Sequence, residues 1–166
     1  MPQQDCPAFS GDSVLDGAFK KVSNSSYSGK YLVMLFYPMD WSFVCPTEIV
    51  AFSDKVEDFK ACGCQVVAVS TDTEFSHLKW TGTPRSQGGV GNIKIPLLSD
   101  KGGAIAKAFG CLDADAGVAF RGLYIMDKKG KVRHVSISDM GVGRSVEEVR
   151  QIAWHLLCLI LPTSPS

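Results

Sequence analysis

Two continuous apolar runs give the clearest structural signal along the chain. One is "KYLVMLFY" at residues 30–37, and the other is "CQVVAVS" at residues 64–70. Runs of this length, rich in aromatic and β-branched residues and without polar alternation, are typical of strands that are buried on both faces. The sequence therefore predicts two strands inside a sheet that has helices on each side.

Helical spacing follows each run. From Cys45 onward, apolar residues recur at intervals of three and four and predict one amphipathic helix, with its core face at Ile49, Phe52, Val56 and Phe59. Residues 70–80 predict a second helix, whose cap is Asp72. Each predicted strand is thus followed by a helix.

The rest of the chain adds shorter elements. The pattern predicts a short strand, a helix that Gly110 ends, a hairpin, and a final helix with a capping box of Ser145 and Glu148, at residues 96–100, 101–110, 120–138 and 143–161. This order of elements favours an α/β protein with a thioredoxin-like fold, whose mostly parallel central sheet is flanked by helices. Because the chain has 166 residues and neither a linker nor a repeat, it is expected to form a single domain over residues 1–166.

Composition narrows the class of partner and the compartment. The 17 Lys and Arg residues balance 17 Asp and Glu residues without a basic run, so nucleic acid is not an expected partner. The longest apolar run, "LLCLILP", is far shorter than the roughly 20 residues that span a bilayer. The first residues also lack the pattern of a secretory signal. Six cysteines in such a chain are expected to stay free in the cytoplasm, where thiols bind metal or do chemistry.

The candidate for chemistry is Cys45, in the segment "YPMDWSFVCPTE" at residues 37–48. It lies where the predicted strand changes to a helix, and Pro46 suits the first turn of that helix. A thiol there faces unpaired N–H groups and the positive end of the helix dipole, which favour the thiolate. Ser42 can donate a hydrogen bond near the sulfur, and Pro38 can turn the loop so that it shields the thiol from water. On these residues alone, a buried small apolar side chain without chemistry remains the alternative.

The segment resembles the active site of the peroxiredoxins, whose pattern is P-x-x-x-[T/S]-x-x-C. Pro38, Ser42 and Cys45 fill this pattern. The similarity extends over residues 5–152 in one register and is greatest to the typical two-cysteine subfamily; it runs through "HLKWTGTPRSQGGVG", "IPLLSD", "RGLYIMDKKGKVRH" and "VGRSVEEVRQI". Several matching segments in the right order are more specific than one short motif.

The resemblance implies a thiol peroxidase that needs no metal and no other cofactor. Cys45 matches the peroxidatic cysteine, whose thiolate attacks a hydroperoxide and becomes sulfenic acid. Ser42, where the family more often has threonine, matches the residue that hydrogen-bonds the peroxide oxygen. Arg121 matches the arginine that stabilises the thiolate and the charge that develops on oxygen. Glu48 and Arg144 match positions that hold this arginine.

The resemblance also implies partners and a supporting residue. The expected substrate is a hydroperoxide, and the expected reductant is thioredoxin or another thiol. Members of the family form homodimers, which often assemble further into rings. Trp80 is expected to pack near the pocket rather than to take part in the chemistry.

The C-terminal residues depart from the family pattern. Typical two-cysteine members carry a resolving cysteine in a V-C-P segment, whereas residues 153–166 of this chain are a divergent tail, "AWHLLCLILPTSPS". Cys158 is the nearest substitute, but it lies in an apolar run, and buried thiols are poor exchange partners because they ionise reluctantly. Either another thiol resolves the sulfenic acid or turnover is impaired. The alternative function is therefore a redox-sensing or chaperone-like partner with the same fold.

Two further site types are not expected. Cys62 and Cys64 form a "CGC" pair, but a metal site would need two more ligands, and the three histidines lack ligand spacing. A thioredoxin-like disulfide reductase would need C-x-x-C after the first buried strand, and Cys45 is followed by "PTE" instead.

Overall fold

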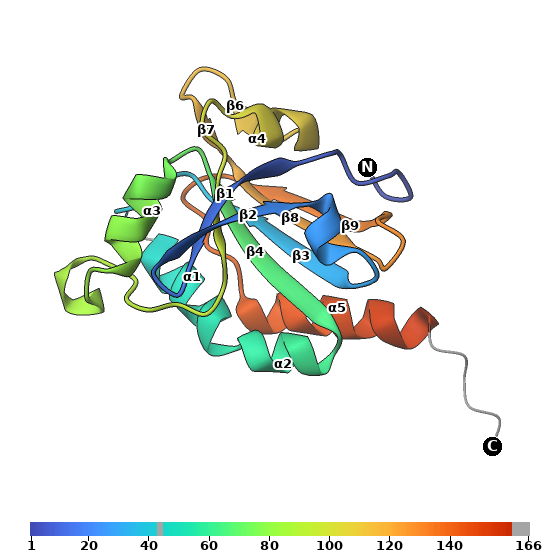
Figure 1. Cartoon of the computed structure of the whole chain (residues 1–166). Coiled ribbons are helices and arrows are strands. Elements are labelled where there is room, and N and C mark those ends of the chain that lie inside the picture. The colour runs from blue at the N-terminus through green and yellow to red at the C-terminus, as the bar shows by residue number, and fades with distance from the viewer. Residues whose placement is uncertain (43–44, 161–166) are drawn as a thin grey trace.

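A seven-stranded sheet forms the centre of the computed structural model (Figure 1). The structure describes residues 1–42 and 45–160, and for residues 157–160 it describes the backbone alone. Within these residues the strand order is β2-β1-β5-β4-β3-β8-β9, and β6 and β7 form a separate hairpin. The strands are β1 (Ser10–Leu15), β2 (Ala18–Ser23), β3 (Tyr31–Phe36), β4 (Cys64–Ser70), β5 (Leu97–Ser99), β6 (Leu112–Asp113), β7 (Val118–Ala119), β8 (Arg121–Met126) and β9 (Val132–Ser138).

Helices cover both faces of the sheet (Figure 1). They are α1 (Cys45–Asp54), α2 (Val56–Ala61), α3 (Glu74–Thr81), α4 (Ala104–Phe109) and α5 (Val146–Ile160), with short 3₁₀ turns η1 (Asn24–Tyr27) and η2 (Arg85–Gln87). Alternate residues of β3 enter two cores. Val33 and Leu35 pack on the side of α1, α2 and α5, whereas Met34 and Phe36 pack on the side of α4. The two cores confirm the expected thioredoxin-like α/β arrangement.

The sheet is mixed, which differs from the expected mostly parallel sheet. Only the β3–β4 and β4–β5 pairings are parallel, whereas β1–β2, β1–β5, β3–β8 and β8–β9 are antiparallel. The difference comes from the hairpin of β1 and β2 and from the antiparallel β1–β5 and β3–β8 pairings, which join segments far apart in the sequence. The first hairpin turns at Asp16 and Gly17, which both have positive φ (53° and 71°). Asp-Gly is a preferred pair for such a turn, so this local signal predicts the hairpin.

Two helix boundaries differ from the predictions, and a third agrees with its prediction. The helix that begins at Cys45 is two helices, because the chain leaves helical geometry at Lys55 (φ −103°, ψ 8°). The cap of α3 is Thr73 rather than Asp72, since the Thr73 hydroxyl accepts the Ser76 N–H at 3.2 Å. Ser145 precedes α5 as predicted, and its hydroxyl accepts the Glu148 N–H at 3.3 Å. Within the described residues, no helix combines the length and apolar character needed to cross a membrane.

Candidate active site

The site forms where β3 ends and α1 begins. Cys45 is the first residue of α1 and is fully buried. Arg121 begins β8, which pairs antiparallel with β3, so the first residue of β8 lies near the end of β3. The Arg121 Nη2 donates to the Cys45 Sγ at 3.2 Å, although the two residues are 76 positions apart. The sheet pairing thus brings the predicted thiol and the predicted arginine into contact.

Glu48 links Arg121 to a second arginine. It lies one helical turn after Cys45, and its Oε1 accepts from the Arg121 Nη1 at 3.3 Å. Its Oε2 accepts from the backbone N–H and the Nε of Arg144 at 2.8 and 3.1 Å. Arg144 also donates to the carbonyl oxygens of Gly122 and Phe36, at 2.6 and 2.8 Å. The site is therefore tied to the ends of β3 and β8 and to the segment before α5.

The charges in this cluster do not balance. Two guanidinium groups, of Arg121 and Arg144, surround the one carboxylate of Glu48, and the three side chains are 2%, 7% and 2% exposed. A buried positive charge is costly without a counter-charge. The Cys45 sulfur accepts from Arg121 and lies at the start of a helix, so a thiolate there would supply the missing negative charge.

The loop between β3 and α1 carries the other two predicted residues. Pro38 is buried directly after the strand, and Ser42 is half-buried. The Ser42 hydroxyl donates to the Met39 carbonyl oxygen at 3.3 Å. Trp41 has a left-handed backbone (φ 64°), which turns the loop sharply. Phe43 and Val44 lie outside the described residues.

Replacing Glu48 by glutamine should destabilise the fold. The substitution leaves Arg121 and Arg144 buried without a carboxylate, and breaking a buried pair from one side costs about 3 kcal/mol or more. Urea unfolding measures the decrease in the free energy of unfolding. The control is Glu57→Gln, which breaks an exposed pair with Lys60 at 3.7 Å and should change stability by less than about 1 kcal/mol. Equal losses in both variants would contradict the role of Glu48 as a counter-charge.

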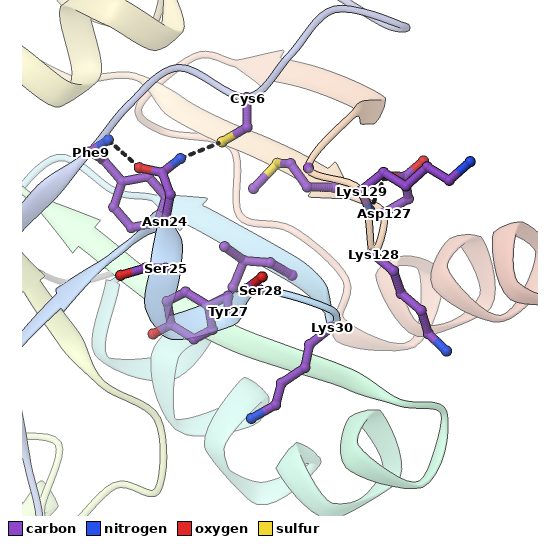
Figure 2. A pocket seen from close by; sticks show the side chains of 13 residues that line it. Cys6, Phe9, Asn24, Ser25, Tyr27, Ser28, Lys30, Asp127, Lys128 and Lys129 are labelled. Carbon is purple, nitrogen blue, oxygen red and sulfur yellow. Dashed lines mark hydrogen bonds between the residues drawn. The ribbon is translucent and has the colours of Figure 1, made fainter.

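The other described cysteines are also free thiols. Burial raises the pKa of Cys6 to about 11, although the Asn24 amide donates to its sulfur at 3.6 Å (Figure 2). Burial also raises the pKa of Cys64 to about 11 and that of Cys111 to about 12. The side chain of Cys158 lies outside the described residues. Across residues 1–42 and 45–156, no group of three or more His, Cys, Asp or Glu side chains is placed to hold a metal ion.

These values predict a steep pH dependence for alkylation of Cys6. The thiolate reacts and the thiol does not, so the rate with iodoacetamide should rise about tenfold for each pH unit until it levels near pH 11. Peptide mass spectrometry after short pulses measures the rate at Cys6. Cys111, which is fully buried, should stay unmodified over the same range and serves as the internal control. If the alkylation rate of Cys6 levelled off below about pH 9, the raised pKa of this thiol would be contradicted.

Comparison with known proteins identifies the family. The AhpC/TSA family matches residues 2–135. Peroxiredoxin-2 of Rattus norvegicus is 51% identical over 146 residues, which cover 88% of this chain and 74% of that protein. The chain belongs to the peroxiredoxin family. A relative from Mus musculus, the mitochondrial thioredoxin-dependent peroxide reductase, is 52% identical over 149 residues, covering 90% of this chain and 58% of that protein.

Solved peroxiredoxin structures have the same fold. The mitochondrial 2-Cys peroxiredoxin of Plasmodium falciparum superposes with a TM-score of 0.90 at 33% identity, covering 99% of this chain and 100% of that chain. AhpC of Enterococcus faecalis gives a TM-score of 0.88 at 32% identity, covering 99% and 98%. The fold class inferred from the sequence is therefore confirmed.

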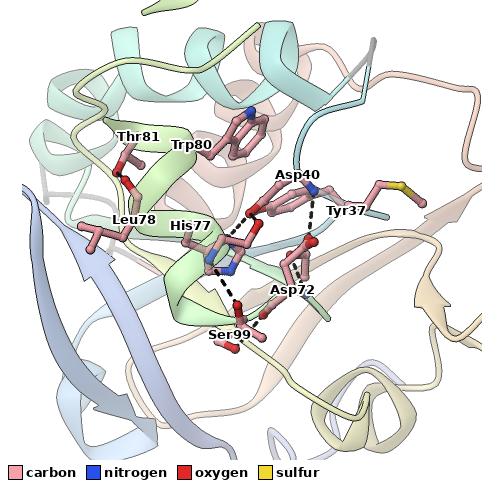
Figure 3. A network of polar contacts seen from close by, with 12 residues as sticks. Tyr37, Asp40, Asp72, His77, Leu78, Trp80, Thr81 and Ser99 are labelled. Carbon is pink, nitrogen blue, oxygen red and sulfur yellow. Dashed lines mark hydrogen bonds and ion pairs between the residues drawn. The ribbon is translucent and has the colours of Figure 1, made fainter. Parts of the chain in front are cut away.

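A second polar network in this peroxiredoxin anchors the loop that precedes Cys45 (Figure 3). The buried Asp40 carboxylate accepts from the Tyr37 hydroxyl and contacts the His77 Nδ1, both at 2.7 Å. The Asp40 N–H donates to the Asp72 carboxylate at 2.8 Å. Burial, followed by the charge of Asp40, raises the pKa of Asp72. No local pattern in the sequence predicts this network, because Asp40 lies 32 positions from Asp72 and 37 positions from His77.

Trp80 packs behind the same loop. It is fully buried, and its ring stacks on Tyr37 with the ring centroids 5.9 Å apart and an interplanar angle of 26° (Figure 3). Its Nε1 donates to the Gly88 carbonyl oxygen at 3.2 Å. Trp80 therefore joins the loop after β3 to the glycine-rich segment after α3, in keeping with a packing position.

Proposed function

We propose that this chain is a thiol peroxidase that reduces hydrogen peroxide and organic hydroperoxides through a sulfenic acid at Cys45, and so contributes to redox homeostasis. The observation that carries the proposal is the 3.2 Å hydrogen bond from the Arg121 guanidinium to the Cys45 sulfur. It lies within a buried cluster that has one more positive than negative charge. The names of the relatives, peroxiredoxin and peroxide reductase, support the same activity.

The reaction needs only the groups of this site. The Cys45 thiolate attacks the terminal oxygen of the hydroperoxide, so that a sulfur–oxygen bond forms as the oxygen–oxygen bond breaks. The sulfur is oxidised to sulfenic acid, and the leaving oxygen takes up a proton and departs as water or an alcohol. Arg121 lies beside the sulfur and stabilises both the thiolate and the charge that builds on oxygen. No metal or other cofactor enters these steps.

Ser42 and Pro38 complete the proposed pocket. The Ser42 hydroxyl donates a hydrogen bond to the Met39 carbonyl oxygen in this structure, and in the proposed pocket it turns to donate to a peroxide oxygen instead. Pro38 is buried between β3 and this loop and limits access of water to the sulfur. Glu48 and Arg144 act as positioning residues for Arg121, and Trp80 supports the loop.

The second half of the cycle needs a reducing thiol. We infer that thioredoxin or another thiol attacks the sulfenic acid and forms a mixed disulfide with Cys45, with release of water. A further thiol then attacks the reductant's sulfur in this disulfide, which releases the Cys45 thiolate and leaves a disulfide between the two reducing thiols. The printed name of the relative from Mus musculus supports thioredoxin. Cys158 as a resolving cysteine remains a hypothesis from the sequence. We further propose that residues 1–166 form one domain, that the protein is a homodimer able to form rings, and that it works in the cytoplasm.

Stoichiometric oxidation tests the proposal. Reduced protein is mixed with one equivalent of hydrogen peroxide, and loss of free thiol is followed beside free cysteine. The proposal predicts oxidation far faster than that of free cysteine and continued peroxide consumption with thioredoxin, thioredoxin reductase and NADPH. Fast oxidation without turnover would favour the redox-sensing or chaperone-like alternative. A rate equal to that of free cysteine would rule out the peroxidase.

A further inference from the structure

A cavity lies far from Cys45 along β3. It has a volume of about 280 Å³ and is enclosed by the N-terminal segment, by η1, by the start of β3 and by the turn between β8 and β9 (Figure 2). Leu32, near the first residue of β3, lines this cavity, whereas Cys45 follows the last residue of the strand. Leu32 also belongs to the core on the α4 side of the sheet, and Cys45 to the opposite core. The cavity is therefore not part of the peroxide site.

The floor of the cavity is apolar. Phe9, Leu32 and Met126 line it and are 5%, 4% and 2% exposed. The ring of Tyr27 flanks them, with its centroid 6.4 Å from that of Phe9. The accessible apolar surface of the cavity therefore comes chiefly from the half-buried side chains of Tyr27 and Cys6, and an aromatic or short aliphatic group placed here would cover it.

The wall beside this floor is held by Asn24. Its Oδ1 accepts the Phe9 N–H at 2.6 Å, and its Nδ2 donates to the Pro7 carbonyl oxygen at 3.1 Å and to the Cys6 sulfur at 3.6 Å. Figure 2 shows the bonds of Asn24 to Phe9 and to Cys6, which join η1 to the N-terminal segment. The wall is thus fixed by hydrogen bonds, and the Cys6 thiol lies within it.

The edge of the cavity is positively charged. Lys30, Lys128 and Lys129 line it and are exposed. Asp127 also lines the cavity, but its carboxylate already accepts the N–H groups of Lys129 and Lys131 at 2.9 Å and lies 3.5 Å from the Arg133 Nη1. Within the part of the chain that the structure describes, the lysines in ion pairs are Lys55, Lys60 and Lys131 instead. Three ammonium groups on flexible stems are therefore available to an anion.

We propose that this cavity binds a small organic anion, with an apolar body on the floor and a phosphate or carboxylate at the edge, toward which the flexible lysine side chains turn. The cavity volume suits a small molecule, the floor favours an aromatic ring, and the charge of the edge favours the anionic group. Neither the floor nor the edge alone is sufficient to bind this anion, because exposed lysines bind anions weakly and the apolar floor is small. The proposal is independent of the peroxidase activity.

Protection of Cys6 against alkylation tests the proposal. Because the thiol lies in the wall of the cavity, an occupant should slow its reaction with a small neutral reagent at about pH 9, measured by peptide mass spectrometry. The probes are phenyl phosphate and phenylacetate, compared with benzyl alcohol and inorganic phosphate. Both aryl anions should protect Cys6 at millimolar concentration, and the more protective one identifies the anionic group. Equal protection by benzyl alcohol or by inorganic phosphate, or no protection by the aryl anions, would overturn the proposal.

Charge variants give the matched control. The triple variant Lys30→Gln, Lys128→Gln and Lys129→Gln should need about tenfold more aryl anion for the same protection of Cys6. Lys55→Gln, Lys60→Gln and Lys107→Gln remove three charges that do not line the cavity and should leave protection unchanged. Oxidation of Cys45 by peroxide should be the same in both triple variants. Equal protection of Cys6 in the two triple variants would contradict the role of the three edge lysines.

Discussion

Replacement of Cys45 by serine is expected to abolish rapid reduction of hydrogen peroxide. A hydroxyl in this position stays protonated near neutral pH and is a weak nucleophile without a base, whereas a thiolate is a strong one. The guanidinium of Arg121 beside the sulfur has no comparable effect on an alcohol. We expect the rate of peroxide consumption to fall by about a thousandfold or more. Stopped-flow mixing with one equivalent of peroxide measures both proteins under the same conditions.

The Cys62→Ser variant provides the control for this loss. Cys62 is half-buried at the end of α2 and is also a free thiol, so its removal changes the thiol count without touching the site. Cys62→Ser should react with peroxide at the rate of the unmodified protein. If Cys45→Ser kept that rate as well, another sulfur would be the one that peroxide oxidises.

Replacement of Arg121 by glutamine should slow the same reaction by about 100-fold, the usual loss when a donor that stabilises developing charge is removed. Its guanidinium donates to the Cys45 sulfur, to Glu48 and to the Met140 carbonyl oxygen. The variant removes the excess positive charge of the cluster, since one guanidinium and one carboxylate remain. Arg121→Lys should be intermediate, because one ammonium keeps the charge but does not hold all three acceptors in a planar fork.

Two measurements separate this effect from simple unfolding. Thermal melts establish that each variant is folded at the assay temperature. Arg133→Gln removes an arginine from the neighbouring strand β9, where it pairs with Asp127 at 3.5 Å, and should leave the peroxide rate unchanged. An Arg121→Gln variant that is folded and reacts at the full rate would exclude stabilisation of the thiolate by this arginine.

Local patterns predicted most of the elements but not the direction of every strand. The runs at 30–37 and 64–70 became β3 and β4, since a continuous apolar run is readable without knowledge of its neighbours. The mixed sheet depends on which strands pair, and the antiparallel β1–β5 and β3–β8 pairings join segments far apart in the sequence. The β1–β2 hairpin does have a local signal, the Asp-Gly pair at residues 16 and 17.

The residues of the site also differ in whether local sequence patterns predict them. Cys45 is visible locally, because a cysteine before proline at a strand-to-helix change is an unusual pattern. Arg121 shows no local sign of its burial, which arises when β8 pairs with β3, and only the resemblance to a family singled it out. Neither a local pattern nor the resemblance to a family predicts the contacts of Asp40 with Asp72 and His77. These contacts join the active-site loop to the segment after β4, which is distant in the sequence.

Trapping of the oxidised sulfur tests the central claim most directly. Reduced protein receives one equivalent of hydrogen peroxide in the presence of dimedone, which captures sulfenic acid, and peptide mass spectrometry then locates the adduct. The account predicts an adduct on Cys45, formed before any of the other five cysteines is modified. An adduct found first on another cysteine, with Cys45 still a free thiol, would contradict it.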